Sequence, residues 1–105
     1  MPFRIPTPEI DAVLEASDGW QRKGKTLIAG FTFDLFETTL DFQTQVAQQA
    51  ETRQQCADVS NNGNRVEIAL TTPALGGITD ADLEFAAIIS RIAEAAGNNT
   101  QENTQ

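Results

Sequence analysis

The chain has 105 residues, which is enough for one compact domain and too few for two. Fifteen acidic residues against seven basic ones give a net charge of −8, which argues against binding nucleic acid through a basic face. The single cysteine cannot form an internal disulfide, and no segment has the length and apolarity of a membrane span or signal peptide, so the sequence predicts a soluble cytoplasmic protein.

The first elements are predicted to be a short helix and a β-hairpin. Thr7 can cap the helix, and Pro8 suits its first turn. A turn signal at Gly24 then divides residues 20–33 into two strands. The apolar residues expected to face the core from this region are Ile10, Val13, Leu14, Phe31 and Phe33.

An amphipathic helix is predicted from Phe36 to about Arg53 and is expected to be the central helix of the fold. Its polar side carries glutamines and acids, including Glu37 and Asp41. Its apolar stripe is expected to contain Phe36, Leu40, Val46, Ala47 and Ala50.

Two further strands and a last helix follow. A short strand is predicted near residues 58–60 and a clearer one at residues 65–71, with the turn at Asn62-Gly63. Thr79 and Asp82 have the spacing of a shortened capping box, and Gly97 is a plausible stop for the helix. The residues expected to be buried are Val66, Ile68 and Leu70 in the strand and Leu83, Ala86, Ala87, Ile89, Ile92 and Ala93 in the helix.

This order predicts an α+β fold of the pattern α-β-β-α-β-β-α, with three helices packed on one face of a four-stranded antiparallel sheet. Residues 1–97 are expected to form the domain. Residues 98–105 are polar, without an apolar anchor, and are expected to be a disordered tail. The open edges of such a sheet favour pairing of two subunits.

Several landmarks occur together in this order. They are GW at residues 19–20, FTFDLF at 31–36, QVAQQAE at 45–51 and GGITDAD at 76–82. The set resembles the pterin-4a-carbinolamine dehydratase family from about Pro8 to Ala96. The resemblance implies a site with a His-His-Pro triplet after the central helix and a further histidine at the end of the fourth strand. It also implies a glutamate at the end of the central helix and an aspartate in the last helix.

The chain departs from that pattern at every histidine. The triplet falls on Gln55, Cys56 and Ala57, and the later histidine falls on Pro73, while the sequence contains no histidine at all. Dehydration of a carbinolamine removes hydroxide and a proton, which suits imidazole because it titrates near neutral pH. Glutamine and proline cannot transfer that proton. The sequence therefore predicts a degenerate pocket without catalytic residues, cofactor or metal, made of Trp20, Glu51, Gln55, Cys56, Pro73 and Asp82.

The retained positions also have plain structural interpretations. Glu51 can be a surface charge, Asp82 a helix cap, Trp20 a core aromatic and Cys56 an inert small residue.

The resemblance extends to a histidine-lacking branch of the family that is associated with α-carboxysomes and assists assembly of ribulose-bisphosphate carboxylase/oxygenase (Rubisco). It implies a non-catalytic Rubisco assembly factor, cytoplasmic or carboxysome-associated, that is a homodimer and binds the large subunit. Two alternatives remain open: a weak dehydratase working through Glu51 and Asp82, and a binding module for another protein.

Overall fold

The computed structural model describes residues 5–15, 19–55 and 57–97, so Cys56 and the predicted tail at 98–105 lie outside the described residues. The element order confirms the predicted α+β pattern. In chain order the elements are α1 (Thr7–Glu15), β1 (Trp20–Lys23), β2 (Thr26–Thr32), α2 (Phe36–Arg53), β3 (Ala57–Asn62), β4 (Arg65–Leu70), the 3-10 helix η1 (Pro73–Leu75) and α3 (Asp80–Ala95).

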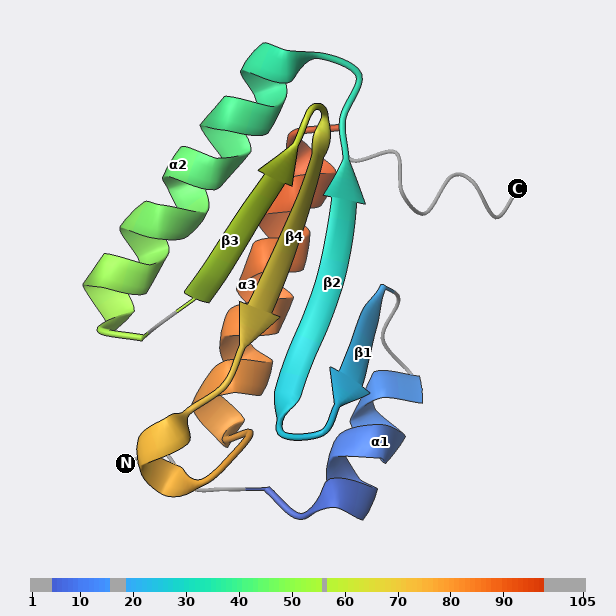
Figure 1. Ribbon diagram of the computed structural model, residues 1–105, viewed down its shortest axis with the longest axis vertical. Coiled ribbons are helices and arrows are strands. Elements are labelled where there is room, and N and C mark those ends of the chain that lie inside the picture. Colours follow the sequence, from blue (N-terminus) through green and yellow to red (C-terminus); the bar gives the residue numbers. More distant parts are fainter. Residues whose placement is uncertain (1–4, 16–18, 56, 98–105) are drawn as a thin grey trace.

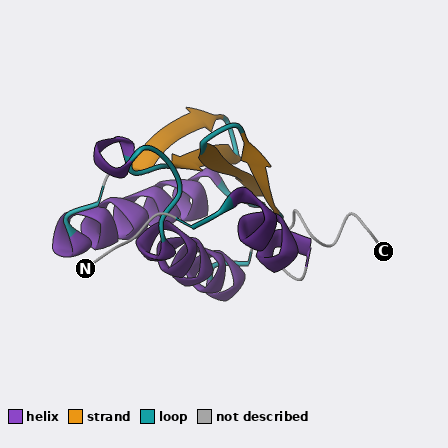
Figure 2. Ribbon diagram, turned by 90° about the horizontal axis from the view of Figure 1, so that it is seen from below, coloured by secondary structure: helices purple, strands orange, loops and turns teal. Residues whose placement is uncertain are grey.

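The four strands form one antiparallel sheet in the order β1-β2-β4-β3. The three helices form a single layer on one face of this sheet, as Figures 1 and 2 show. Alternation in β4 places Val66, Ile68 and Leu70 in the core, as predicted, and Leu27 and Phe31 of β2 join them. The helix layer thus covers one face, and the other face is open.

The β3–β4 hairpin differs slightly from the prediction. Strand β3 extends from Ala57 to Asn62 rather than covering only residues 58–60. The turn is therefore Gly63–Asn64, one residue later than expected. Gly63 has a φ of 65°, which a glycine adopts without a steric penalty.

An aromatic cluster fixes the rotation of α2. The ring of Phe42 lies 5.2 Å from that of Phe31 and 5.0 Å from that of Phe33, measured between centroids. Thr39 and Val46, which flank Phe42 at helical spacing, are fully buried with it. Thr39 is tolerated in the core because its hydroxyl donates to the carbonyl of Leu35 at 3.1 Å.

The predicted apolar stripe of α2 is wrong for Phe36, Leu40 and Ala47. Phe36 and Leu40 are 52% and 45% exposed, and Ala47 is exposed as well. Only Val46 of that set is fully buried, and Ala50 is half-buried. The buried aromatic cluster decides the helix rotation because Phe42 fills the space under β2, and Phe36 and Leu40 are turned to solvent as a result.

Helix α3 follows the prediction closely. Thr79 accepts a hydrogen bond from the Asp82 backbone N–H, and the Asp82 side chain accepts one from the Thr79 backbone N–H, which completes the capping box. The helix buries Ala86, Ile89 and Ala93, with Leu83 and Ile92 packed at the margin, whereas Ala87 is exposed. Gly97 has a φ of 90° directly after the C-cap residue Ala96, in agreement with its predicted role as a stop.

Helix α1 packs beside β1. Ile10 is buried, but Val13, which was expected on the same face, is 45% exposed. An ion pair joins the two elements: Nε of Arg22 lies 2.8 Å from Oδ1 of Asp11. The hydrogen bond from Arg22 lowers the pKa of the Asp11 carboxyl below its ordinary value, and the charge of Arg22 acts in the same direction to a smaller extent.

The lowered pKa of Asp11 gives the stability a pH dependence of known sign. A depressed folded-state pKa stabilises the fold above the ordinary aspartate pKa of about 3.9, and this contribution disappears as the pH falls through the folded-state value. We expect Asp11→Asn to lower the melting temperature slightly at neutral pH, because the pair is exposed and screened. The difference from wild type should vanish in strong acid. Asp58→Asn on β3 serves as the control, and an Asp11→Asn deficit that persisted in strong acid would contradict the linkage.

Candidate functional site

A hollow of about 450 Å³ lies where α2 ends and α3 begins. Three segments that are distant in sequence meet there: the end of α2, the chain after β4 with η1, and the start of α3. Its lining residues are Arg53, Gln54, Gln55, Thr71, Thr72, Pro73, Ala74 and Ala81.

A left-handed residue at the end of α2 turns the chain into this hollow. Gln54 has a φ of 55°, and it is the only described residue other than glycine with a positive φ. Its backbone N–H donates to the carbonyls of Ala50 and Glu51, and the N–H of Gln55 donates to that of Ala50 at 2.9 Å. These bonds satisfy the last carbonyls of the helix and place Gln55 at the wall of the cavity.

Arg53 holds that wall in place. Its Nε donates to Oε1 of Gln55 at 2.7 Å, and one terminal nitrogen lies 2.6 Å from Oε1 of Glu84. The guanidinium also lies over the ring of Phe85, 5.5 Å from its centroid. The Arg53 side chain therefore joins Gln55 at the end of α2 to Glu84 and Phe85 of α3.

The side-chain amide nitrogen of Gln55 has no hydrogen-bond partner. Its Nε2 is buried without a partner, and no other described side-chain nitrogen or oxygen shares this condition. A buried amide donor without an acceptor is unfavourable by about 1–3 kcal/mol, so this side chain has a local cost in the folded chain. An amide can accept and donate hydrogen bonds but cannot act as an acid or base near neutral pH.

Asp82 lies behind the cavity wall and not in its lining. Its side chain is 1% exposed, and Oδ2 accepts hydrogen bonds from the Thr72 hydroxyl at 2.8 Å and from the Thr79 N–H at 3.0 Å. The Thr79 hydroxyl lies 3.3 Å from the same oxygen. Asp82 thus ties the chain after β4 to the first turn of α3, which matches the capping interpretation.

The other predicted site residues are dispersed. Pro73 lines the cavity beside Gln55. Glu51 is exposed on α2 and does not line it. Trp20 is buried under the sheet, where Nε1 donates to the Ser90 hydroxyl at 2.8 Å and the ring meets that of Phe31 edge-on.

Sequence analysis did not anticipate the role of Thr72 in this site. A Thr-Thr-Pro run after the last strand was the available signal, because a hydroxyl at that point can satisfy the cap of the next helix.

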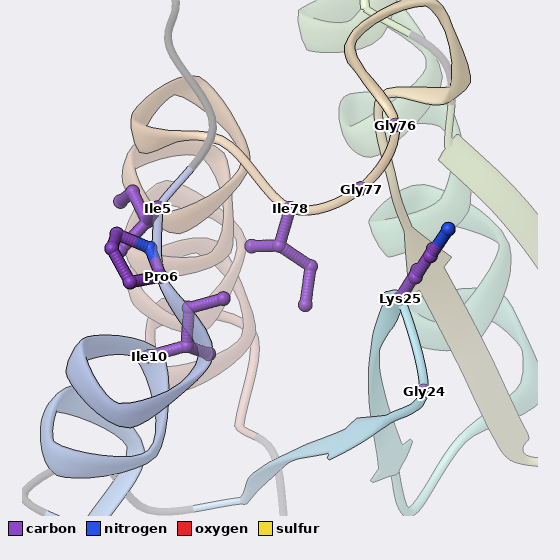
Figure 3. A pocket seen from close by; sticks show the side chains of 8 residues that line it. All are labelled: Ile5, Pro6, Ile10, Gly24, Lys25, Gly76, Gly77 and Ile78. Carbon is purple, nitrogen blue, oxygen red and sulfur yellow. The ribbon is translucent and has the colours of Figure 1, made fainter.

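A second hollow, of about 140 Å³, lies on the other side of the loop between η1 and α3. Figure 3 shows Ile5, Ile10 and Ile78 on one side of it, while Lys25 comes from the β1–β2 turn. The N–H of Ile5 donates to the carbonyl of Ile78 at 2.9 Å, which fixes the segment before α1 against this loop. Because this hollow is small and its walls are mainly aliphatic side chains and glycine backbone, it is the weaker candidate for a binding site.

Metal and membrane sites are not indicated by the described residues. They contain no group of three or more His, Cys, Asp or Glu side chains placed to hold a metal ion. Within the same residues, no helix has both the length and the apolar character needed to cross a bilayer.

Residues 4–92 match the sequence profile of the family described as pterin 4 alpha carbinolamine dehydratase. The chain belongs to the pterin-4-alpha-carbinolamine dehydratase family. Among its relatives are two proteins provisionally named as dehydratases of this family. One, from Thermosynechococcus vestitus, is 36% identical and covers 89% of this chain and 98% of its own. The other, from Thermomicrobium roseum, is 32% identical and covers 86% and 97%.

Two solved structures of the family type share the fold. The transcriptional coactivator/pterin dehydratase from Brucella melitensis has a TM-score of 0.81 at 32% identity, covering 86% of this chain and 98% of its own. A pterin dehydratase-like protein identified as a Rubisco assembly factor in the α-carboxysome has a TM-score of 0.61 at 26% identity, covering 73% and 92%. Members of this fold thus include proteins described as enzymes and a protein described as an assembly factor.

The contribution of the Thr79–Asp82 capping box to stability can be measured by mutation. We expect Thr79→Ala to lower the free energy of unfolding by about 1 kcal/mol, because the first turn of α3 loses its side-chain acceptor and Asp82 loses a partner. Chemical denaturation measures this change. Thr44→Ala, at an exposed threonine on α2, is the matched control and should change stability much less. Equal effects of the two substitutions would contradict the capping role.

Proposed function

We propose that this protein is a non-catalytic assembly factor for Rubisco that acts in the cytoplasm or with α-carboxysomes. Its client would be the large subunit of Rubisco. The observation that carries the proposal is the absence of imidazole: the sequence contains no histidine, and the cavity presents Gln55 and Pro73 where the family resemblance implies histidines. The similarity of the fold to that of a solved Rubisco assembly factor also supports the proposal.

The remaining carboxylates are poor substitutes for the missing histidines. Asp82 is buried and engaged in the helix cap. Glu51 is exposed on α2 and is not part of the cavity lining. An acid–base catalyst must come within hydrogen-bond reach of the proton it transfers, so neither geometry favours catalysis. Among the described residues, the cavity lining therefore includes no group suited to the proton transfers of dehydration.

A second candidate function is weak dehydratase activity working through Glu51 and Asp82. It is favoured by the names of the two relatives described above. A third candidate is a binding module for a different protein, which the description of the Brucella structure as a transcriptional coactivator supports.

We also propose that the protein is a homodimer. Strand β3 is an edge strand with β4 as its one strand neighbour, whereas the other edge strand, β1, packs beside α1. An edge with unpaired backbone groups favours pairing with a second copy.

The dehydratase alternative is tested by turnover of a pterin carbinolamine. We expect less than a hundredth of the rate of a histidine-bearing family member, because each positioned acid or base contributes on the order of a hundredfold or more. Turnover within tenfold of such an enzyme, abolished by Glu51→Gln or Asp82→Asn, would favour the enzyme over the assembly factor.

The assembly role is tested by co-expression with Rubisco subunits. We expect a higher yield of assembled Rubisco with an unchanged turnover rate per active site, since an assembly factor acts before the enzyme is complete. Gln55→Ala and Cys56→Ala should keep most of the gain because the proposed activity lies in a surface and not in the cavity. An unchanged yield, with no complex with the large subunit at low ionic strength, would rule the role out.

A further inference from the structure

The hairpin of β3 and β4 contains three asparagines at its tip, and one of them precedes a glycine. Asn61 and Asn62 end β3, and Gly63 and Asn64 form the turn that leads into β4. Of all the asparagines in the chain, only Asn62 is followed by glycine. A main-chain nitrogen reaches the preceding side-chain carbonyl most easily when it belongs to glycine, because glycine has no Cβ to obstruct the approach.

Hydrogen bonds hold the side chains of the other two asparagines. Nδ2 of Asn61 donates to the carbonyl of Gly63 at 3.2 Å, across the turn. Nδ2 of Asn64 donates to the carbonyl of Asp34 at 3.0 Å, and the carbonyl of Asn64 accepts from the Phe33 N–H at 3.0 Å. Asn64 therefore fixes the turn to the segment between β2 and α2, which lies beside it in Figure 1.

The side chain of Asn62 has no such restraint. It is exposed and makes no hydrogen bond to the described part of the chain. Together with Ser60, Arg65 and Glu67 it borders a hollow of about 150 Å³, so its amide has room to rotate and water can reach it. Arg65 is its partner across the hairpin but does not hold the amide, because the guanidinium lies against Gly30 of β2.

The main-chain nitrogen of Gly63 is also accessible. Gly63 is exposed, and its N–H makes no main-chain hydrogen bond to a described residue. A Cβ placed on this residue would meet nothing within 4 Å, so the space around it is open. A nucleophile and the carbonyl that it can attack thus belong to adjacent residues at an exposed turn.

We propose that Asn62 is a site of spontaneous deamidation in the folded protein. The nitrogen of Gly63 attacks Cγ of Asn62 and closes a succinimide ring, a step favoured because both groups belong to one chain. The bond from Cγ to the side-chain nitrogen breaks, and this nitrogen leaves as ammonia with the proton that Gly63 gives up. Water from solvent then opens the ring at either carbonyl. The reaction consumes one water, releases one ammonia and needs no oxidant.

The two ring openings give products of different structure. One product is an aspartate at position 62. The other is an isoaspartate, in which the side-chain methylene becomes part of the main chain. Both products add a negative charge to the tip of the hairpin at neutral pH. The isoaspartate also lengthens the main chain at a turn that is closed by the pairing of Asn62 with Arg65, so it disrupts the hairpin while the aspartate does not. The modification does not depend on the assembly role proposed above.

Mass spectrometry of the aged protein tests the proposal. The full-length protein is incubated at physiological temperature and mildly alkaline pH, and trypsin then releases residues 54–65, which include all three asparagines of the hairpin tip. We expect this peptide to gain the mass difference between NH2 and OH, with the change localised to Asn62 by fragmentation. Equal modification of Asn61 or Asn64 would contradict the proposal. If a synthetic peptide of residues 54–65 reacts and the folded protein does not, the fold protects Asn62 and the proposal is wrong.

Substitutions distinguish the attacked residue from its neighbour. Asn62→Gln adds a methylene, so the attack must close a larger ring, and we expect ammonia release and modification of the peptide to slow at least about tenfold. Asn61→Gln is the matched control, because Asn61 is also exposed at the end of β3, and it should react at the wild-type rate. Thermal melts confirm that both variants are folded. Equal rates in wild type and Asn62→Gln would exclude Asn62 as the site.

Anion-exchange chromatography tests the consequence for the hairpin. Deamidated molecules carry an additional negative charge and are separated from unmodified ones. Asp18 also precedes a glycine, but its isomerisation changes neither mass nor charge and is not collected by this step. Asn62→Asp reproduces the aspartate product and should melt at the temperature of fresh wild type, whereas the isoaspartyl fraction should melt at a lower temperature. Equal melting temperatures of that fraction and Asn62→Asp would overturn the predicted effect on the hairpin.

Discussion

The contact of Phe42 with Phe31 and Phe33 decides how the long helix α2 lies on the sheet. Aromatic rings in tilted contact bury a large apolar area and fix the angle between the two elements. Because Phe42 is fully buried, Thr39 and Val46 must face the sheet with it, and the residues one position further along the helix must face away. The same contact that builds the core therefore leaves Phe36, Leu40 and Ala47 exposed.

The rotation of α2 also has consequences at its C-terminal end. It directs Arg53 toward Phe85 and Glu84 of α3, so that the guanidinium joins the two helices and holds the amide of Gln55. The left-handed conformation of Gln54 then reverses the chain into β3. The cavity between α2, η1 and α3 follows from how these elements meet, and Gln55 and Pro73 form part of its lining.

Much of the fold was predictable because the patterns were local. The period of two in residues 65–70 identified β4 and its buried face, and the spacing of Thr79 and Asp82 identified the start of α3. The face of α2 was not predictable in the same way, because hydrophobicity favoured Phe36 and Leu40 while the tertiary contact of Phe42 decided the rotation. A buried Thr39 and a left-handed Gln54 gave no signal, since each is stabilised by hydrogen bonds that exist only in the folded chain. For the candidate site, the sequence indicated that Gln55 and Pro73 would meet, but it could not show that Glu51 lies outside the cavity or that Asp82 is engaged as a cap.

Two features of the molecule bear on where its function lies. The amide nitrogen of Gln55 is buried without a partner, and the cavity lining includes no described group suited to moving a proton near neutral pH. The outer side of α2, in contrast, exposes Phe36 and Leu40 although neither contributes to the core, and exposing them to water is unfavourable in the isolated protein. Burial of these two side chains against another surface would remove that cost, whereas the described cavity lining offers no comparable gain.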